Sequence, residues 1–483
     1  MNEIENLAPE LLWKHFSKLC EIPRPSKYED KVVEYIEGFA RENKLDYSRD
    51  SVGNIIIRKS ASSGMEKSPI VVLQSHVDMV PQKNNDKNHD FLVDPITPVI
   101  DGDWVRADKT TLGADNGIGV ASMLAILESD NIKHGPVEAL FTIDEETGMT
   151  GAFELSDDFV KGRILLNLDT EDENEICIGC AGGMDTNIKF HYLEEPVPNN
   201  MSSYEIVIKG LQGGHSGIDI HLERGNAIKI LTRILWQASK IYGLRLSYIE
   251  GGNMRNAIPR ESKAVVVVEE AAKNDFITFF KEKENLIKTE LKLNEPALEI
   301  SITETEQPYT LLCSDIQHKL LNALYACPNG VIRMSKAMPG VVETSTNLAI
   351  VHMEDGIISV NCLLRSAINS AKRNLGNMID SVFTLAGADV SFEGEYPGWT
   401  PDTKSSTLNI ASTIYSKMFG KQPEIVVVHA GLECGIIGAK YSGIDMISFG
   451  PTIKNAHSPD EKVNIKSVGN YWNFLLEVLK NIK

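Results

Sequence analysis

The sequence predicts an α/β protein in which a mostly parallel sheet is flanked by helices, with an α+β domain that carries an antiparallel sheet inserted into the chain. Two observations support this prediction. In the first third of the chain, short apolar and β-branched segments alternate with segments of helical periodicity, which is typical of a parallel sheet. After about residue 186, polar and apolar residues alternate instead, which is typical of antiparallel strands with one exposed face.

Three strands are expected in the first third, and each ends abruptly at polar residues. They cover residues 70–75, 137–143 and 164–168. Continuous apolar runs of this kind are typical of strands that are buried on both faces. Helical periodicity fills residues 117–127, and an apolar stripe from Leu11 to Leu19 predicts an opening helix.

The rest of the chain follows a different pattern before it returns to the first one. Alternating strands are expected at residues 204–210 and 356–364, with a long charged helical stretch between them. A helix is then expected from about Ser406, followed by apolar runs at residues 425–428 and 445–449.

The 483 residues are enough for two large domains. Turn-rich segments rich in Pro, Asn and Ser occur near residues 191–203 and 396–402, where the pattern changes. We therefore assign residues 1–186 and 399–483 to one discontinuous domain and residues 187–398 to the inserted domain.

The charge balance excludes several kinds of partner. Lys and Arg number 48 against 67 Asp and Glu, which gives a formal net charge of −19. Nucleic acids and anionic membranes attract a positive field, so we expect neither as a partner. The N-terminal segment carries acidic residues where a signal peptide would be basic, and no apolar run approaches the ~20 residues that cross a bilayer.

The cysteines indicate a reducing compartment. The chain has seven, an odd number, and they are scattered along the sequence. This pattern is typical of reduced thiols, so we expect a cytoplasmic protein. Cys177 and Cys180 form a C-x-x-C pair, but no second pair follows at zinc-finger spacing, so we expect two packed thiols there.

Imidazoles and carboxylates fall where a ligand crevice would form. One group follows predicted strands, and Asp115 lies just before a predicted helix. The first group consists of His76, Glu145, Glu146, Asp169 and His457. The carboxyl ends of parallel strands meet at one edge of a sheet, so these six residues could converge. Each alone is typical of a structural histidine, a turn or a solvated corner, whereas the set suits two divalent ions, usually zinc and sometimes cobalt or manganese.

Several sequence blocks resemble the M20 metallopeptidase family. They are SHVDMV (75–80), LGADNGIG (112–119), DEETGMTGA (144–152), NLDTEDE (167–173), GGHSG (213–217), GGNMRNAIP (251–259) and GPTIKNAHSP (450–459). Further blocks are similar to its bacterial aminoacyl-histidine dipeptidase branch, also called cytosolic non-specific dipeptidase. These are PQKNND (81–86), PNGVIR (328–333), VVETSTN (341–347) and HAGLECG (429–435). The resemblance covers the whole chain in order.

The resemblance implies roles for the candidate metal ligands. His76 and Asp169 would bind one metal ion, Glu146 and His457 would bind the other, and Asp115 would bridge them. The family also has a cis peptide bond after the bridging Asp, here between Asp115 and Asn116.

Two carboxylates would support this metal site. Glu145 would be the general base, because its neighbour is a ligand and holds it beside the ions. Asp78 would accept the second imidazole N–H of His76 and fix its tautomer.

The resemblance also assigns roles to residues outside the metal site. His215 would stabilise the oxyanion, and in related dimers this histidine comes from the partner subunit. Asn256 and Arg365 would hold the substrate carboxylate, although Arg365 could also be a charge on a strand surface. His429 and Glu433 could line the substrate pocket or simply pack, and Cys434 is expected to pack.

The expected function is therefore that of a metal-dependent dipeptidase. It would hydrolyse unblocked dipeptides, including Xaa-His dipeptides such as β-alanyl-histidine, through a metal-bound hydroxide and a Glu base. A homodimer would form through the inserted domain, which would act as lid and dimerisation domain. The alternatives are an amidase or deacylase of N-acyl amino acids and a catalytically silent binding protein on the same fold. A dehydrogenase is disfavoured, because no G-x-G-x-x-G follows an early strand.

Overall fold

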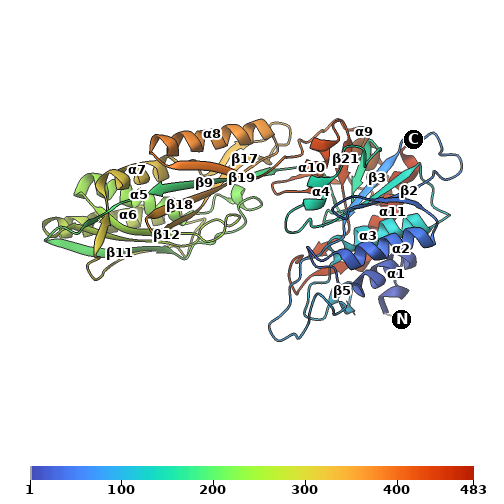
Figure 1. Ribbon diagram of the computed structural model, residues 1–483, viewed down its shortest axis with the longest axis horizontal. Helices are drawn as coiled ribbons and strands as arrows, with labels where there is room; N and C mark the ends of the chain where they lie inside the picture. Colours follow the sequence, from blue (N-terminus) through green and yellow to red (C-terminus); the bar gives the residue numbers. More distant parts are fainter. Residues whose placement is uncertain (1–2) are drawn as a thin grey trace. The chain divides into compact units, whose positions relative to one another are not determined.

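The computed structural model describes residues 3–483, which fold into two compact units (Figure 1). The first unit contains the chain up to Gly179 together with Trp399–Val427 and Leu432–Lys483. The inserted unit contains Cys180–Gly398 and Val428–Gly431. The expected boundary after residue 186 falls inside strand β9 (Gly182–His191), which pairs along its whole length with β18 (Ile357–Ser366). This pairing explains why residues 182–186 belong to the inserted unit.

The first unit is built around an eight-stranded sheet with the order β1-β2-β6-β3-β7-β21-β8-β20. Its strands are β1 (Asp46–Arg49), β2 (Ile55–Lys59), β3 (Val71–His76), β6 (Val137–Thr142), β7 (Ile164–Asn167), β8 (Glu175–Cys180), β20 (Glu424–Val428) and β21 (Asp445–Ser448). Strands β6, β3, β7 and β21 are parallel, whereas β1, β2 and β8 pair antiparallel. The α/β class is confirmed, with the parallel part confined to the centre of the sheet.

Helices and a small sheet complete the first unit (Figure 1). The helices are α1 (Glu10–Cys20), α2 (Asp30–Glu42), α3 (Ala114–Glu128), α4 (Thr150–Glu154), α9 (Ser406–Phe419), α10 (Glu433–Lys440) and α11 (Ile465–Asn481), with a 3₁₀ turn η1 (Glu3–Asn6). The small sheet has the order β22-β23-β5-β4, with β22 (Ile453–Lys454), β23 (Lys462–Asn464), β5 (Trp104–Ala107) and β4 (Pro98–Asp101). Helix α3 is buried on every side from residue 114 to 127, as its apolar sequence requires.

The three strands expected from the sequence lie side by side in the order β6-β3-β7. The register places His76 of β3 opposite Thr142 of β6, and Gln74 of β3 opposite Asn167 of β7. The parallel strands therefore deliver the residues that follow them to one edge of the sheet.

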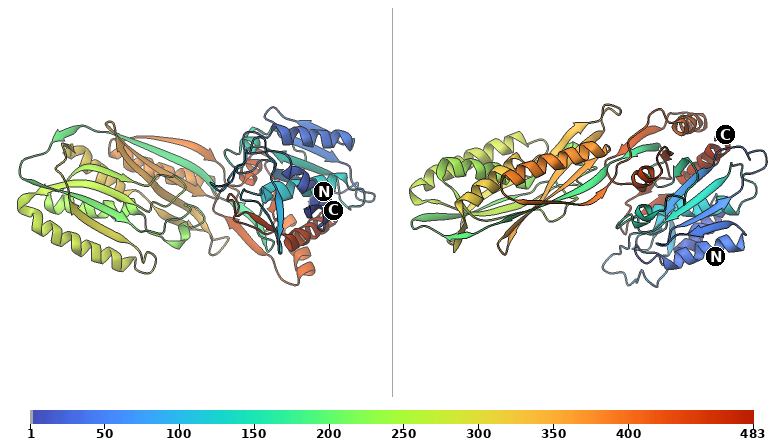
Figure 2. Two further views of the ribbon diagram at one scale, coloured as in Figure 1. Left: turned by 90° about the horizontal axis from the view of Figure 1, so that it is seen from below. Right: turned by 45° about the horizontal axis from the view of Figure 1, so that its top comes forward.

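The inserted unit is an antiparallel sheet with helices along one face (Figure 2, right). The order is β14-β11-β13-β12-β17-β18-β9-β19, and β16 pairs with β17. The strands not yet named are β11 (Met201–Lys209), β12 (Arg245–Gly251), β13 (Ser262–Glu269), β14 (Glu299–Glu304), β16 (Gly330–Met334), β17 (Val342–Glu354) and β19 (Asp389–Tyr396); a separate pair is β10 (Glu194–Pro196) with β15 (Thr310–Leu312). The helices are α5 (Ala227–Tyr242), α6 (Lys273–Glu290), α7 (Ser314–Ala326) and α8 (Asn369–Leu385), with 3₁₀ turns η2 (Ile220–Leu222) and η3 (Glu270–Ala272).

The alternating pattern read from the sequence explains how this sheet packs. Tyr204, Ile206 and Ile208 of β11 are buried in the core, in the same cluster as Leu231 and Leu235 of α5. Alternate residues of one strand thus cover the hydrophobic stripe of a helix, which removes both apolar surfaces from water.

Neither a disulfide bond nor a helix long and apolar enough to span a membrane occurs within residues 3–483. Cys177, Cys180 and Cys434 are all fully buried, which agrees with the expectation that they pack.

Candidate functional site

The candidate residues divide between the two units. The first unit contains His76, Asp78, Asp115, Glu145, Glu146, Asp169, Glu433 and His457. The inserted unit contains His215, Asn256, Arg365 and His429.

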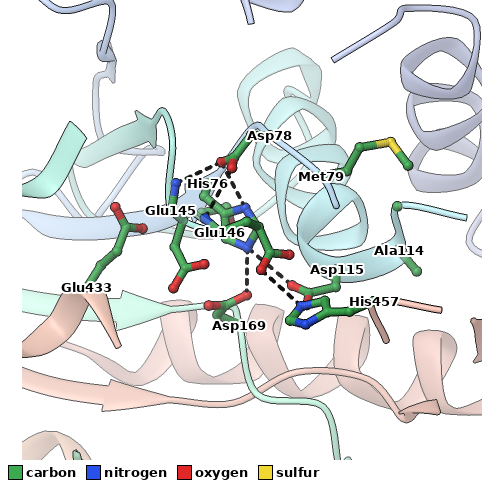
Figure 3. Close-up of polar contacts among 12 residues, drawn as sticks. His76, Asp78, Met79, Ala114, Asp115, Glu145, Glu146, Asp169, Glu433 and His457 are labelled. Atoms are coloured by element: carbon green, nitrogen blue, oxygen red, sulfur yellow. Dashed lines mark hydrogen bonds and ion pairs between the residues drawn. The ribbon is translucent and has the colours of Figure 1, made fainter. Parts of the chain in front are cut away.

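The first group converges at the carboxyl ends of the central strands (Figure 3). His76 is the last residue of β3, Glu146 follows β6, and Asp169 follows β7. Asp115 lies at the start of α3, and His457 lies in the loop between β22 and β23. Convergence of these residues was expected from the sequence, and the parallel register produces it.

Five of these polar residues form two ligand sets that share one carboxylate. His76 Nε2 lies 3.2 Å from Asp115 Oδ1 and 3.3 Å from Asp169 Oδ1. The second oxygen of Asp115, Oδ2, lies 3.2 Å from His457 Nε2, and that nitrogen lies 2.9 Å from Glu146 Oε2. In each set the candidate ligand atoms lie within 4.8 Å of one another. This arrangement fits two adjacent cations with Asp115 between them.

The buried carboxylates of the cluster favour the binding of positively charged ions. Among the described residues, Glu146 Oε1 is buried and has no hydrogen-bond partner, and buried Asp169 Oδ1 has only its 3.3 Å contact with His76 Nε2. Burial raises the pKa of Asp169 to about 7, because a buried carboxylate lacks the solvation of water. Contacts with Asp115 and Glu146 raise the pKa of His457 to about 11. The donor set, imidazoles with carboxylates, suits two divalent metal ions such as zinc.

Asp78 lies where an orienting carboxylate should lie. It is fully buried, and its Oδ1 is 3.3 Å from His76 Nδ1. It also accepts the backbone N–H groups of Glu145 (3.0 Å) and Glu146 (3.2 Å) and the hydroxyl of Ser26 (2.8 Å). A proton on Nδ1, the nitrogen that faces Asp78 Oδ1, leaves the lone pair of His76 Nε2 for a metal.

Glu145 and Glu433 lie beside each other at one side of the cluster (Figure 3). Burial raises the pKa of Glu145 well above its usual range, and the negative charges of Asp169 and Glu146 act in the same direction. Glu433 is 1% exposed, and its Oε2 accepts hydrogen bonds from Gln74 Nε2 (2.6 Å) and Thr142 Oγ1 (2.8 Å). Its Oε1 has no hydrogen-bond partner in the described part of the chain.

The sequence interpretation missed the polar residues that hold Glu433. Gln74 donates to Glu433 and accepts from Asn167 Nδ2 at 2.6 Å. A signal was present, because Gln74 interrupts an apolar strand two residues before His76 and therefore points to the same face of the sheet.

In the inserted unit, His215 and Arg365 direct hydrogen-bond donors into one region. The backbone N–H groups of Gly217 (3.2 Å) and Ile218 (3.0 Å) donate to His215 Nδ1, so the proton of the neutral ring lies on Nε2. Arg365 Nη2 is 3.5 Å from that Nε2, and Arg365 Nη1 donates to the hydroxyl of Tyr396 at 3.1 Å. Two adjacent donors suit an anionic oxygen. Because Arg365 is 5% exposed, its interpretation as a strand-surface charge is wrong.

The other two candidates of the inserted unit differ in exposure. Asn256 has an exposed side chain, and its backbone oxygen accepts from the N–H of Ser216 at 2.7 Å. His429 is buried, and its Nε2 lies 2.7 Å from Ser345 Oγ. Burial lowers the pKa of His429 to about 3, and the positive charge of Arg365 acts in the same direction.

The depressed pKa of His429 predicts a pH-dependent stability. Between pH ~6.5 and about 3 the unfolded chain binds a proton at this histidine and the folded chain does not, so the free energy of unfolding falls as pH falls. One such group contributes a slope of up to ~1.4 kcal/mol per pH unit. Denaturant unfolding from pH 7 to 5 should therefore show a shallower loss of stability for His429→Gln than for the unsubstituted protein. Parallel curves would contradict this prediction.

The chain is similar to known peptidases along its whole length. Residues 72–481 match the peptidase family M20/M25/M40. The chain is 46% identical over 482 residues to the cytosol non-specific dipeptidase of Escherichia coli K12, covering 100% of this chain and 99% of that protein. The crystal structure of an aminoacylhistidine dipeptidase from Vibrio alginolyticus is 47% identical, with a TM-score of 0.95 and coverage of 100% and 98%. A tripeptidase structure from Staphylococcus aureus, 18% identical with a TM-score of 0.56 and 99% coverage of both chains, shares the fold.

Proposed function

Since this chain belongs to peptidase family M20/M25/M40 and is a peptide hydrolase, we propose that it is a dinuclear metal dipeptidase that hydrolyses unblocked dipeptides, including Xaa-His dipeptides such as β-alanyl-histidine. The observation that carries the proposal is the pair of ligand sets that share Asp115 beside the half-buried Glu145. Relatives named dipeptidases at 46% and 47% identity over the whole chain support the substrate class.

The metal ions would be held by the two ligand sets. His76 and Asp169 would hold one ion, Glu146 and His457 the other, with Asp115 contributing one oxygen to each. Two divalent cations bound there would polarise the scissile carbonyl and acidify water. The donor set favours zinc, with cobalt and manganese as alternatives. Asp78 would keep the ring of His76 in the tautomer that presents Nε2.

Glu145 would move the proton of the reaction. Its side chain is half-buried beside the ligand sets, and desolvation raises its pKa. It would take a proton from the attacking water and return it to the amine that leaves when the peptide bond breaks. A carboxylate with a raised pKa is a stronger base toward water, and its acid form can return the proton to the leaving amine.

The inserted unit would bind the negative charges of the substrate. The Nε2–H of His215 would donate to the oxyanion, and in a homodimer this histidine would come from the partner subunit. Arg365 and Asn256 would bind the free carboxylate of the dipeptide, with the guanidinium held by Tyr396. A homodimer through the inserted unit, in the cytoplasm, is part of this proposal.

Glu433 would bind the free amino group of the dipeptide. Its Oε1 is buried and has no hydrogen-bond partner within residues 3–483, and the Glu433 side chain lies beside Glu145 (Figure 3). An ammonium group would supply the positive charge and the donor that this oxygen lacks. An N-acylated substrate has no such charge, so this feature disfavours the amidase or deacylase alternative.

Substitution of Glu433 by Gln is expected to raise KM for unblocked dipeptides by ~10–100-fold, because a hydrogen bond between charged groups contributes about 1.5–3 kcal/mol. The KM for N-acetylated dipeptides should differ little between the Glu433→Gln variant and the unsubstituted protein. Steady-state kinetics with both substrates tests this, with the exposed Glu424→Gln as the matched control. An equal KM for dipeptides in both proteins would remove Glu433 from the substrate site.

The decisive test of the function is a substrate panel. Metal-stripped protein restored with zinc, cobalt or manganese should hydrolyse dipeptides, Xaa-His among them, faster than tripeptides or N-acetylated peptides. Preference for blocked amines would support the deacylase, and no hydrolysis with any metal would support the silent binding protein.

A further inference from the structure

Asp115 lies in a backbone turn that is bound by two buried side chains of opposite charge. These side chains come from different segments of the chain. The turn covers residues 112–115. Glu461 and Arg24 are each 2% exposed, and neither belongs to the ligand sets. We propose that Arg24 and Glu461 act as positioning residues that hold the Asp115 carboxylate between the two metal ions. The inference rests on the proposed function, because it assumes that Asp115 bridges two metals.

Glu461 uses both carboxylate oxygens on this turn. Its Oε2 accepts the N–H groups of Leu112 (2.7 Å) and Gly113 (2.9 Å), and its Oε1 accepts those of Ala114 (2.7 Å) and Asp115 (3.2 Å). Four consecutive backbone donors are therefore bound to one anion, which fixes the orientation of each peptide group.

Glu461 also connects the turn to a second ligand. It lies four residues after His457, and its own N–H donates to the backbone oxygen of Ser458 at 3.0 Å. The loop that carries His457 and the turn that carries Asp115 are thus held together by one side chain. The distance between this loop and this turn determines how far His457 lies from Asp115 in the second ligand set.

Arg24 holds the same turn through its carbonyl side. Its Nη2 donates to Gly113 O at 2.6 Å, while its Nη1 donates to Val77 O (2.8 Å) and Asp78 O (3.0 Å). The guanidinium therefore connects the turn to the segment just after His76. This contact fixes the position of Asp115 relative to His76 in the first ligand set. Gly113 has φ +69°, and a Cβ there would lie 2.6 Å from Arg24 Nη2, so the close approach requires glycine.

The two side chains compensate each other's burial. An ionised group buried alone is costly, whereas a cation and an anion on opposite sides of one hydrogen-bonded turn offset that cost. Neither group has a place in the proton transfer or in substrate binding. Their contacts instead join the three segments that carry His76, Asp115 and His457, as residues around metal ligands commonly do.

The test uses Glu461→Gln and Arg24→Lys in the full-length protein. A Gln amide has a single acceptor oxygen, so it leaves backbone donors of the turn without an acceptor. A Lys ammonium lacks the planar fork that reaches both segments. Each variant should bind metal ~10–100-fold more weakly, the usual effect of losing a partner of a metal ligand. kcat should fall while KM stays within about twofold, because the substrate-binding residues are unchanged.

The primary readout is metal affinity rather than turnover. Chelator-treated protein is titrated with Zn²⁺ by calorimetry and with Co²⁺ by absorption, and circular dichroism confirms that the metal-free variants are folded. The matched controls are Asp460→Asn, which removes one exposed negative charge next to Glu461, and the exposed Arg41→Lys. Both controls should bind metal like the unsubstituted protein. The double variant should lose less affinity than the product of the single losses, since both residues act on one turn.

The outcomes separate this inference from the proposed function. Binding of two equivalents of metal by the unsubstituted protein, with unchanged affinity in both variants, would overturn the positioning role alone. Loss of thermal stability in a variant whose metal affinity is unchanged would do the same. If Glu461→Gln does not fold, Arg24→Lys decides the matter. Failure of the unsubstituted protein to bind two ions would overturn the proposed function, and the positioning role with it.

Discussion

Replacement of Glu145 by Gln is expected to leave metal binding intact and to lower kcat by ~10³-fold or more, within the range by which general acid–base groups accelerate reactions. Gln is nearly isosteric with Glu, so the backbone N–H groups of residues 145 and 146 can still donate to Asp78. The amide cannot accept a proton from water at neutral pH or return one to the leaving amine. Only the proton transfer is removed.

The measurement compares turnover and metal content in the same preparations. kcat is determined with saturating dipeptide, and bound metal is determined by elemental analysis after desalting. Glu154→Gln, at the exposed end of α4, is the matched control and should retain full activity. Hydrolysis at the unsubstituted rate by metal-loaded Glu145→Gln would refute the role of Glu145 as the base.

The site in the first unit was largely predictable because its geometry follows from local sequence. β3, β6 and β7 appear as apolar runs, and the ends of those runs identify His76, Glu146 and Asp169 as neighbours. Parallel register then brings the ends together without any knowledge of long-range contacts. The cis bond at Asp115-Asn116, implied by the family resemblance, is also present.

What could not be predicted depends on contacts between distant residues. Gln74 and Glu433 are 359 positions apart, and no pattern in either segment indicates their hydrogen bond. Arg24 and Glu461 are buried charges that no pattern in the sequence indicates, because burial of a charge depends on partners that only the folded chain supplies.

The burial of Arg365 also could not be predicted from the sequence pattern of its strand. Polar and apolar residues alternate along this strand, as they do in a strand with one exposed face, so a surface position for Arg365 was possible. The last residues of β18 are instead buried on both faces, and Tyr396 of β19 supplies the hydrogen-bond partner. Tertiary packing therefore decides between two interpretations that strand periodicity cannot separate.

Substitution of Asp115 by Asn is expected to reduce metal binding at both positions and to lower kcat/KM by ~10²–10⁴-fold, because one carboxylate supplies an oxygen to each ligand set and stabilises both ions. An amide offers one oxygen acceptor and no charge, so it can serve one ion at most. The ion that keeps the amide oxygen would still lose the negative charge, and the other ion would lose a ligand and that charge together, so both positions should weaken.

Asp169→Asn is the informative comparison, since Asp169 belongs to the His76 set alone. Titration of each chelator-treated variant with Zn²⁺ should show one weakened position for Asp169→Asn and two for Asp115→Asn. The bridging assignment requires this difference in stoichiometry and not merely a difference in activity. If Asp115→Asn retains one position with the affinity of the unsubstituted protein, its carboxylate serves a single ion, and the two ligand sets must be joined in another way.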